Sequence, residues 1–263
     1  PTAEVIASCG EFIPDEFRPT WDQEGVHEIY RAWRKILNSY PGDRMAVAEA
    51  WVSPASRIAR YLRPDELANS FNFDFLTSLW KPKYLTGMIN RAVDAMAEVG
   101  APPSWVFNNH DVTRSVDRFD LGLQNRQVNT FERQGDPAQF DIERGTLRAR
   151  AGALLMLALP GGAYIYQGEE LGLPEHTTLE GKYRQDPTYF RTKGERVGRD
   201  GCRVPIPWEA DAPAMGFNTT GEAWLPQPAG YKIYARASQR GVAGSTLELY
   251  KRLIKVRKDH QMG

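Results

Sequence analysis

The chain has 263 residues, of which 41% are apolar and 25% are charged, and its 33 basic side chains balance its 33 acidic ones. This composition suits one large globular domain or two small ones, and it excludes a disordered, collagen-like or disulfide-rich chain. Because the net charge is zero and no run of lysines and arginines occurs, a nucleic-acid partner is not expected.

The spacing of the cysteines and the hydropathy of the chain exclude further classes of protein. Cys9 and Cys202 are far apart and form no metal-ligand spacing, so neither a disulfide scaffold nor a zinc site is expected, and a cytoplasmic location is the simplest prediction. The longest apolar stretch, residues 151–166, is interrupted by Pro160 and is too short to span about 30 Å of hydrocarbon. No membrane association is therefore expected.

Apolar residues recur at helical spacing in several segments of the chain. The predicted helices cover residues 24–38, 87–99, 146–159 and 247–256. Between them lie short runs typical of strands, three of them continuously apolar and one (71–75) alternating with period two. The predicted strands cover residues 45–48, 71–75, 105–107 and 163–166. This alternation predicts an α/β protein, either a doubly wound sheet or a (β/α) barrel.

The ends of the predicted strands favour the barrel. Three of the four strands end in polar or acidic residues, and barrel enzymes build their active sites at those ends. No glycine-rich phosphate-binding loop follows any strand, so no nucleotide cofactor is expected. Two long segments, 113–145 and 171–244, have little periodicity, and loops of this length are usually functional or disordered.

Glu49 is the first candidate for chemistry. It ends a strand of small apolar residues beside Trp51, where partial removal from water would favour the protonated form that a general acid needs. The alternative is a strand-end glutamate in water or paired with an arginine.

The polar residues 108–111 are the second candidate. Four consecutive hydrogen-bonding side chains directly after an apolar strand are costly to bury unless something polar binds to them. These side chains are suited to binding hydroxyl groups through hydrogen bonds. The alternatives are turns and helix capping, or half of a metal site.

Two further groups of residues are weaker candidates. Glu169 and Glu170 lie between Gly168 and Gly172, which predicts a turn rather than a catalytic pair. Aromatic residues near strand ends serve either as sugar-stacking platforms or as core, and the sequence does not separate these uses. They are Trp51, Trp80, Tyr164 and Tyr166.

Taken together, four segments resemble the α-amylase family, glycoside hydrolase family 13, and fit its α-glucosidase and oligo-1,6-glucosidase branch best. They are residues 48–52, 107–114, 163–172 and 198–208. The last resembles that branch's Arg-Asp-x-x-Arg-Thr-Pro-Met-x-Trp segment, with Val204 and Ile206 as departures. The resemblance implies that residues 1–263 are the C-terminal half, strands 5–8, of a (β/α)8 TIM barrel with long active-site loops.

The resemblance also assigns roles. Glu49 matches the general acid/base at the end of the fifth strand, and Asp111 matches the aspartate that stabilises the transition state. The resemblance also implies substrate-binding or site-supporting roles for four other residues, of which Arg203 is the weaker match. They are His110, Arg199, Arg203 and Arg114.

The family uses a retaining mechanism with a nucleophilic aspartate in a Gly-Phe-Arg-x-Asp motif, which is absent here. Neither Asp15 nor Asp22 follows an apolar strand, so neither is expected to replace it. The simplest interpretation is a fragment that begins after the fourth strand. We expect it to be inactive alone, because losing a covalent nucleophile elsewhere costs about 10⁶ in rate.

The predicted function of the parent enzyme is hydrolysis of short α-1,4- or α-1,6-linked gluco-oligosaccharides. A transglycosylase or isomerase of the same family, forming trehalose or isomaltulose, and a non-catalytic barrel relative are the alternatives. No organic cofactor is expected, and no metal site is predicted because no Asp-x-Asp-x-Asp loop occurs. Metal dependence and linkage preference stay open.

Overall fold

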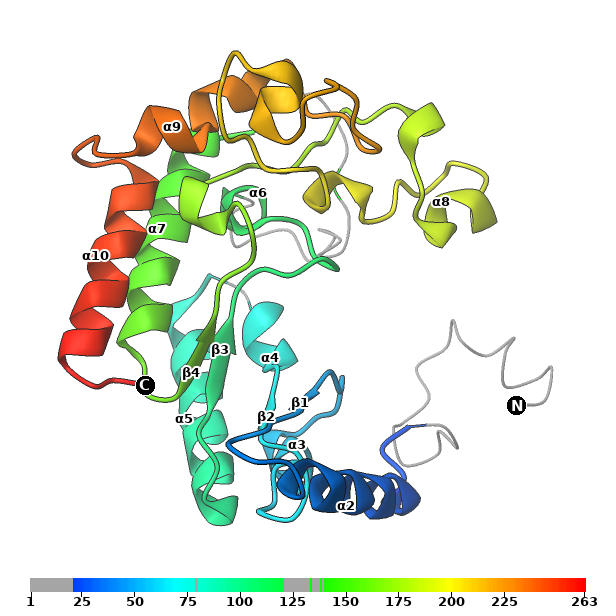
Figure 1. Cartoon of the computed structure of the whole chain (residues 1–263), viewed down its shortest axis with the longest axis vertical. Helices are drawn as coiled ribbons and strands as arrows, with labels where there is room; N and C mark the ends of the chain where they lie inside the picture. Colours follow the sequence, from blue (N-terminus) through cyan, green and yellow to red (C-terminus); the bar gives the residue numbers. More distant parts are fainter. Residues whose placement is uncertain (1–20, 79, 121–132, 134–137, 139) are drawn as a thin grey trace. The chain divides into compact units, whose positions relative to one another are not determined.

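The computed structural model describes residues 21–78, 80–120, 133, 138 and 140–263 (Figure 1). Asp15 and Cys9 lie outside these described residues. The chain divides into two compact units, one made of residues 1–74 and 86–104 and the other of residues 75–85 and 105–263. A membrane-spanning helix, long and apolar enough to cross a bilayer, is not found in the described part.

The first unit is built around two short parallel strands. Strand β1 (Val47–Ala48) pairs with β2 (Asn69–Ser70), and Val47 lies opposite Asn69. Among the described residues, the helices that lie wholly or mostly in this unit are α2 (Glu24–Asn38), α3 (Ala55–Arg60) and α5 (Pro82–Val99). The buried apolar residues that form its core come from β1, α3, α5 and the segments beside them. They include Ala48, Val52, Ile58, Leu62, Leu67 and Met96.

One predicted strand is wrong. Residues 71–75 do not form a strand, since β2 ends at Ser70 and helix α4 covers Phe73–Leu76. The alternating aromatic pattern is misleading because Phe73, Phe75 and Leu76 are all buried. A strand would turn the adjacent Phe75 and Leu76 to opposite faces, whereas one helical turn buries all three.

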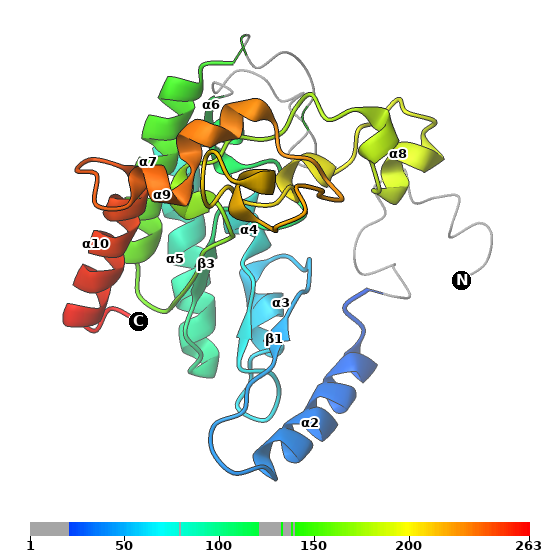
Figure 2. The ribbon, with the colours of Figure 1, turned by 45° about the horizontal axis from the view of Figure 1, so that its top comes forward.

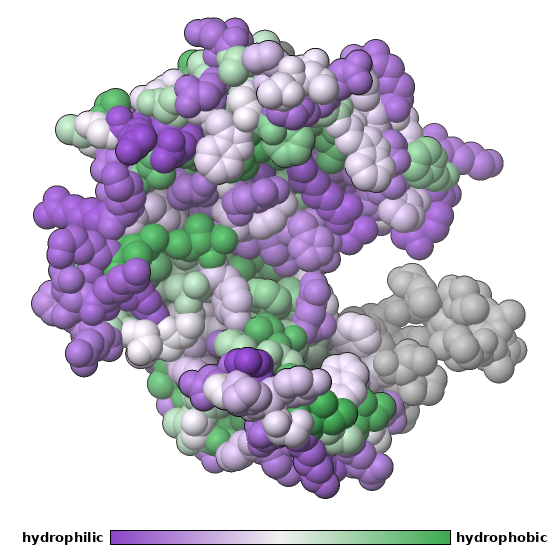
Figure 3. Space-filling model, in the orientation of Figure 1, coloured by the Kyte–Doolittle hydropathy of each residue, from purple (hydrophilic) through white to green (hydrophobic). Residues whose placement is uncertain are grey.

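The second unit contains strand β4 (Gly162–Tyr164), which pairs with β3 (Ser104–Val106), and helices α6 (Ser115–Asp120), α7 (Ile142–Ala158) and α10 (Thr246–Asp259). Figures 1 and 2 both show α7 and α10 side by side, and Arg257 of α10 donates hydrogen bonds to the carbonyls of Leu157 and Leu159. The outer surface of α10 is hydrophilic in Figure 3, as its amphipathic sequence predicts.

The predicted long loop at 171–244 contains a series of short helical turns joined by irregular segments. Turns of three to six residues are too short to show a periodic pattern, which explains why the sequence indicated none. They are η4 (Glu169–Leu171), η5 (Gly181–Tyr183), α8 (Pro187–Arg191), η6 (Asp200–Cys202), η7 (Pro213–Gly216), η8 (Ala229–Tyr234) and α9 (Arg236–Gln239). The small hydrophobic core of this segment includes Leu171, Leu173, Val204 and Tyr231.

The predicted helices are confirmed, α2 with the same bounds and the others to within a few residues. Three of the four predicted strands are also present: those at 45–48 and 163–166 are shortened, and the one at 105–107 is shifted by one residue. The α/β class is therefore confirmed, and the arrangement as half of a barrel over residues 1–263 stays a prediction.

Candidate active site

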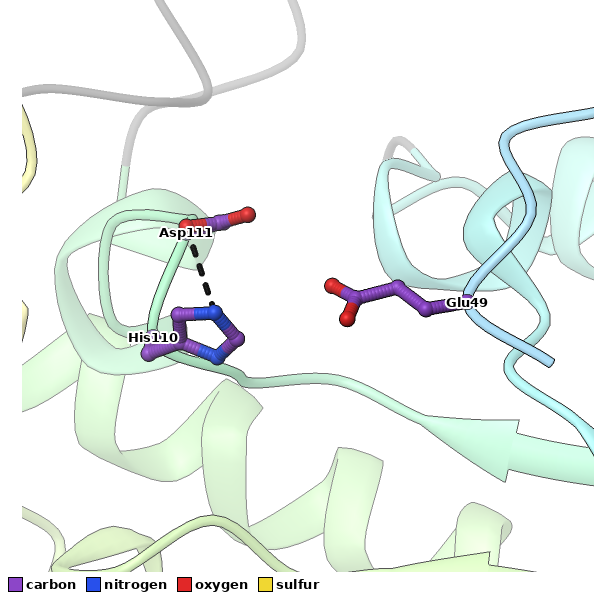
Figure 4. A group of neighbouring side chains, drawn as sticks. All are labelled: Glu49, His110 and Asp111. Carbon is purple, nitrogen blue, oxygen red and sulfur yellow. Dashed lines mark ion pairs between the residues drawn. The ribbon is translucent and has the colours of Figure 1, made fainter. Parts of the chain in front are cut away.

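Glu49 directly follows β1 in the first unit, at the strand end where the sequence placed it (Figure 4). Its side chain is exposed, so the expected partial desolvation is not observed among the described residues. It lines a pocket of about 330 Å³ together with aromatic side chains, including Tyr30 and Tyr61. Trp51 lines the same pocket and stacks on Phe73 with 3.9 Å between ring centroids.

Asp22 lines this pocket too, with its carboxylate inaccessible to solvent. The Tyr61 hydroxyl donates a hydrogen bond to Asp22 Oδ1 over 2.7 Å, and Arg57 pairs with Oδ2. Burial and this hydrogen bond raise the pKa of Tyr61. Both carboxylate oxygens of Asp22 are therefore occupied within the first unit.

In the second unit, the loop after β3 carries the predicted polar cluster. Asn108 Oδ1 accepts a hydrogen bond from the backbone N–H of Ser115, the first residue of α6, and Asn109 Oδ1 accepts one from the N–H of Asp111. Helix capping and turn formation, the alternative that the sequence left open, therefore describe the two asparagines. His110 and Asp111 remain for other contacts.

Asp111 is the centre of a cluster of charges. Its Oδ1 atom accepts hydrogen bonds from Arg199 Nη1 at 2.8 Å and from Arg203 Nη2 at 3.0 Å. His110 Nε2 lies 3.6 Å from the same oxygen, as the dashed line in Figure 4 marks. Arg203 Nε also donates to the carbonyl of His110. The structure thus brings together His110, Asp111, Arg199 and Arg203, although Arg199 is 88 residues from Asp111 in sequence.

Sequence reasoning missed Asp186, which caps α8 and is fully buried. It accepts hydrogen bonds from the N–H and Nε of Arg199 and from the N–H of Thr188. Burial alone would raise the pKa of Asp186, but these hydrogen bonds hold it well below its usual range. The Asp-Pro pair at the start of α8 is a helix-start signal, but it carries no information about Arg199.

Arg114 is fully buried and lies behind the charged cluster rather than in it. Its guanidinium donates to the carbonyls of Gln167 and Cys202, 2.9 Å from each, and packs over the Tyr166 ring. It therefore ties the loop after β3 to the segment that carries Arg203. The site-supporting role that the resemblance implies for Arg114 stays a prediction.

Two buried acids beside Arg114 were also missed. Glu175 Oε2 accepts a hydrogen bond from the N–H of Arg114, and Asp117 Oδ2 accepts one from the N–H of Glu175. Burial raises the pKa of Glu175 to about 8 and that of Asp117 to about 6. Nothing in their sequence neighbourhood signals this burial.

The predicted turn at residues 168–172 is confirmed. Gly168 and Gly172 both adopt the left-handed conformation and flank η4. Glu169 is buried and accepts a hydrogen bond from the Tyr250 hydroxyl over 2.8 Å, which is a structural contact with α10.

Comparison with known proteins gives a consistent set of relatives. Residues 10–262 match the family described as "Alpha amylase, catalytic domain". Maltase A1 of Drosophila melanogaster is 29% identical over 90% of this chain and 38% of its own length. An oligo-1,6-glucosidase of Heyndrickxia coagulans is 27% identical over 98% of this chain and 51% of its own length.

A solved structure of similar fold is described as the alpha-glucosyl transfer enzyme XgtA. It is 29% identical to this chain, with a TM-score of 0.71 over 91% of this chain and 40% of XgtA. The chain therefore spans about half, or less, of the length of these relatives.

Proposed function

Because the chain belongs to the α-amylase catalytic-domain family, we propose that the intact protein is a retaining α-glucosidase of short α-1,4- or α-1,6-linked gluco-oligosaccharides. The observation that carries the proposal is the convergence of His110, Arg199 and Arg203 on one oxygen of Asp111. The relatives named maltase and oligo-1,6-glucosidase support this substrate class.

In this proposal Glu49 is the general acid/base. It protonates the oxygen of the leaving sugar and then takes a proton from the water that releases glucose. The nucleophilic carboxylate comes from outside these 263 residues. Asp22 does not serve, because its carboxylate is inaccessible to solvent and is held by Tyr61 and Arg57.

Asp111 stabilises the positive charge that develops on the sugar in the transition state. Within the described part of the chain, its side-chain hydrogen bonds and ion pairs all involve Oδ1. This leaves Oδ2 to face the sugar, and the half-exposed His110 lies beside it to bind a hydroxyl group. Arg199 and Arg203 hold Asp111 in place and add donors for the glucose unit.

Glucosyl transfer is the second candidate, and the similarity to the alpha-glucosyl transfer enzyme XgtA favours it. The two reactions share the glucosyl-enzyme intermediate and differ in whether water or a second sugar accepts the glucosyl group. Analysis of the products from maltose and sucrose separates them. Both reactions release the reducing-end glucose of maltose, so two glucose molecules per maltose with no larger product indicate hydrolysis, whereas longer oligosaccharides, trehalose or isomaltulose indicate transfer or isomerisation.

The variant Glu49→Gln in the intact protein tests the proposal. We expect it to slow glucose release from maltose by about 10²-fold or more, the usual contribution of a general acid. The first step with p-nitrophenyl α-glucoside should be largely spared, because nitrophenolate leaves without a proton. The control is Glu180→Gln, whose exposed side chain pairs only with Lys182 among the described residues. Equal losses for both substrates would contradict the acid role.

A further inference from the structure

We infer that Asp186 is a positioning residue, whose buried carboxylate directs the Arg199 guanidinium onto Asp111. The inference rests on the proposed function, in which Arg199 and Asp111 meet the glucose unit. Asp186 itself is inaccessible to solvent and cannot touch the sugar. Its effect must therefore pass through the residues that it contacts, and Arg199 is the one of the two neighbouring arginines that donates hydrogen bonds to it.

The contacts of Asp186 hold Arg199 at two points. Asp186 Oδ2 accepts one hydrogen bond from the backbone N–H of Arg199, at 3.0 Å, and another from Nε of the same residue. The backbone N–H and the Nε atom of this long, flexible residue are thus both bound to the same carboxylate oxygen. From this position Nη1 of Arg199 reaches Asp111 Oδ1 at 2.8 Å.

Asp186 is held in turn by the segment that carries Arg199. Asp200 Oδ2 accepts hydrogen bonds from the N–H groups of Gln185 and Asp186, at 2.9 and 3.0 Å. A Cβ atom at Gly198, whose φ is +69°, would lie only 2.7 Å from Asp186 Cβ. A glycine is therefore needed for residues 198–200 to approach Asp186 this closely.

Helix capping alone does not explain a buried aspartate at this position. A cap accepts one or two backbone N–H groups, and asparagine caps a helix about as well as aspartate. Here Thr188 supplies the capping hydrogen bond to Oδ1, while Oδ2 faces guanidinium groups. Arg203 Nη1 lies 3.8 Å from Oδ2, so a second cation is close to it. A negative charge is what these arginines require.

The test is a double-mutant cycle in the intact protein with Asp186→Asn, Arg199→Ala and both changes together. The asparagine side chain would keep one oxygen to cap the N–H of Thr188, but it would lose the charge and the second oxygen, which accepts the hydrogen bonds from Arg199. We expect Asp186→Asn to lower kcat/KM for maltose by about 10- to 100-fold, the usual range for one charge-assisted hydrogen bond. In the Arg199→Ala background the same change should have no further effect.

Asp141→Asn is the matched control, because Asp141 caps α7 through the N–H of Arg144 and has no contact with Arg199 among the described residues. It should leave kcat/KM unchanged. An equal loss from Asp186→Asn in both backgrounds would show a merely structural role and overturn the inference, as would an unchanged kcat/KM. Should Asp186→Asn fail to fold, Asp186→Ser keeps a capping oxygen without the charge and replaces it in the cycle.

A crystal structure of the same variant separates this inference from the proposed function. We expect Arg199 to move out of hydrogen-bonding distance of Asp111. If the wild-type protein cleaves no α-glucoside, the proposed function fails, and the crystal structure still decides the positioning role. Arg199 remaining within hydrogen-bonding distance of Asp111 would overturn it.

Discussion

The buried carboxyl group of Glu175 makes the stability of the protein depend on pH. Burial raises its pKa from a usual value of 4.5 to about 8. Between these values the folded state binds a proton that the unfolded state has released, so the contribution of Glu175 to stability is greatest below pH 4.5 and falls as the pH rises toward 8. Each pH unit in this window lowers the free energy of unfolding by about 1.4 kcal/mol at most, which gives a loss of about 2–3 kcal/mol between pH 5 and pH 7.

The variant Glu175→Gln isolates this effect, because glutamine keeps an oxygen for the N–H of Arg114 and does not titrate. The free energy of unfolding in urea, followed by tryptophan fluorescence at pH 5, 6 and 7, measures it. The wild-type protein should lose about 2–3 kcal/mol more than the variant over this range. Glu180→Gln, at an exposed position, should behave like the wild type. Parallel pH profiles for wild type and Glu175→Gln would refute the reasoning.

Two other predictions follow from close packing and from the missing nucleophile motif. Gly145→Ala would place a Cβ atom on the carbonyl oxygen of Val116, so α6 and α7 must move apart. We expect the free energy of unfolding to fall by about 1–3 kcal/mol, which circular dichroism would detect as a lower melting temperature. An unchanged melting temperature would contradict this contact. The 263-residue chain alone should release no p-nitrophenol from p-nitrophenyl α-glucoside above background, and clear turnover would show that it holds its own nucleophile.

Local patterns predicted the helices well. Helix α2 has the predicted bounds because its amphipathic spacing ends at a Tyr-Pro-Gly turn, and both signals are local. The predicted strand at 71–75 failed because Phe73, Phe75 and Leu76 are buried by contacts that no local pattern encodes.

The candidate site, like the fold, was predicted from the sequence only in part. The family resemblance selected His110, Asp111, Arg199 and Arg203, and the structure brings these four together. Spacing alone could not have paired Asp111 with an arginine 88 residues away. The role of Asp186 depends entirely on its burial against Arg199, which is a property of the folded chain.

The stereochemistry of the first product tests the central claim most directly. Proton NMR of the intact protein acting on p-nitrophenyl α-glucoside distinguishes the anomer released first from the one formed later by mutarotation. A retaining enzyme forms and hydrolyses a covalent glucosyl intermediate, so α-glucose should appear first. Initial release of β-glucose would contradict the account.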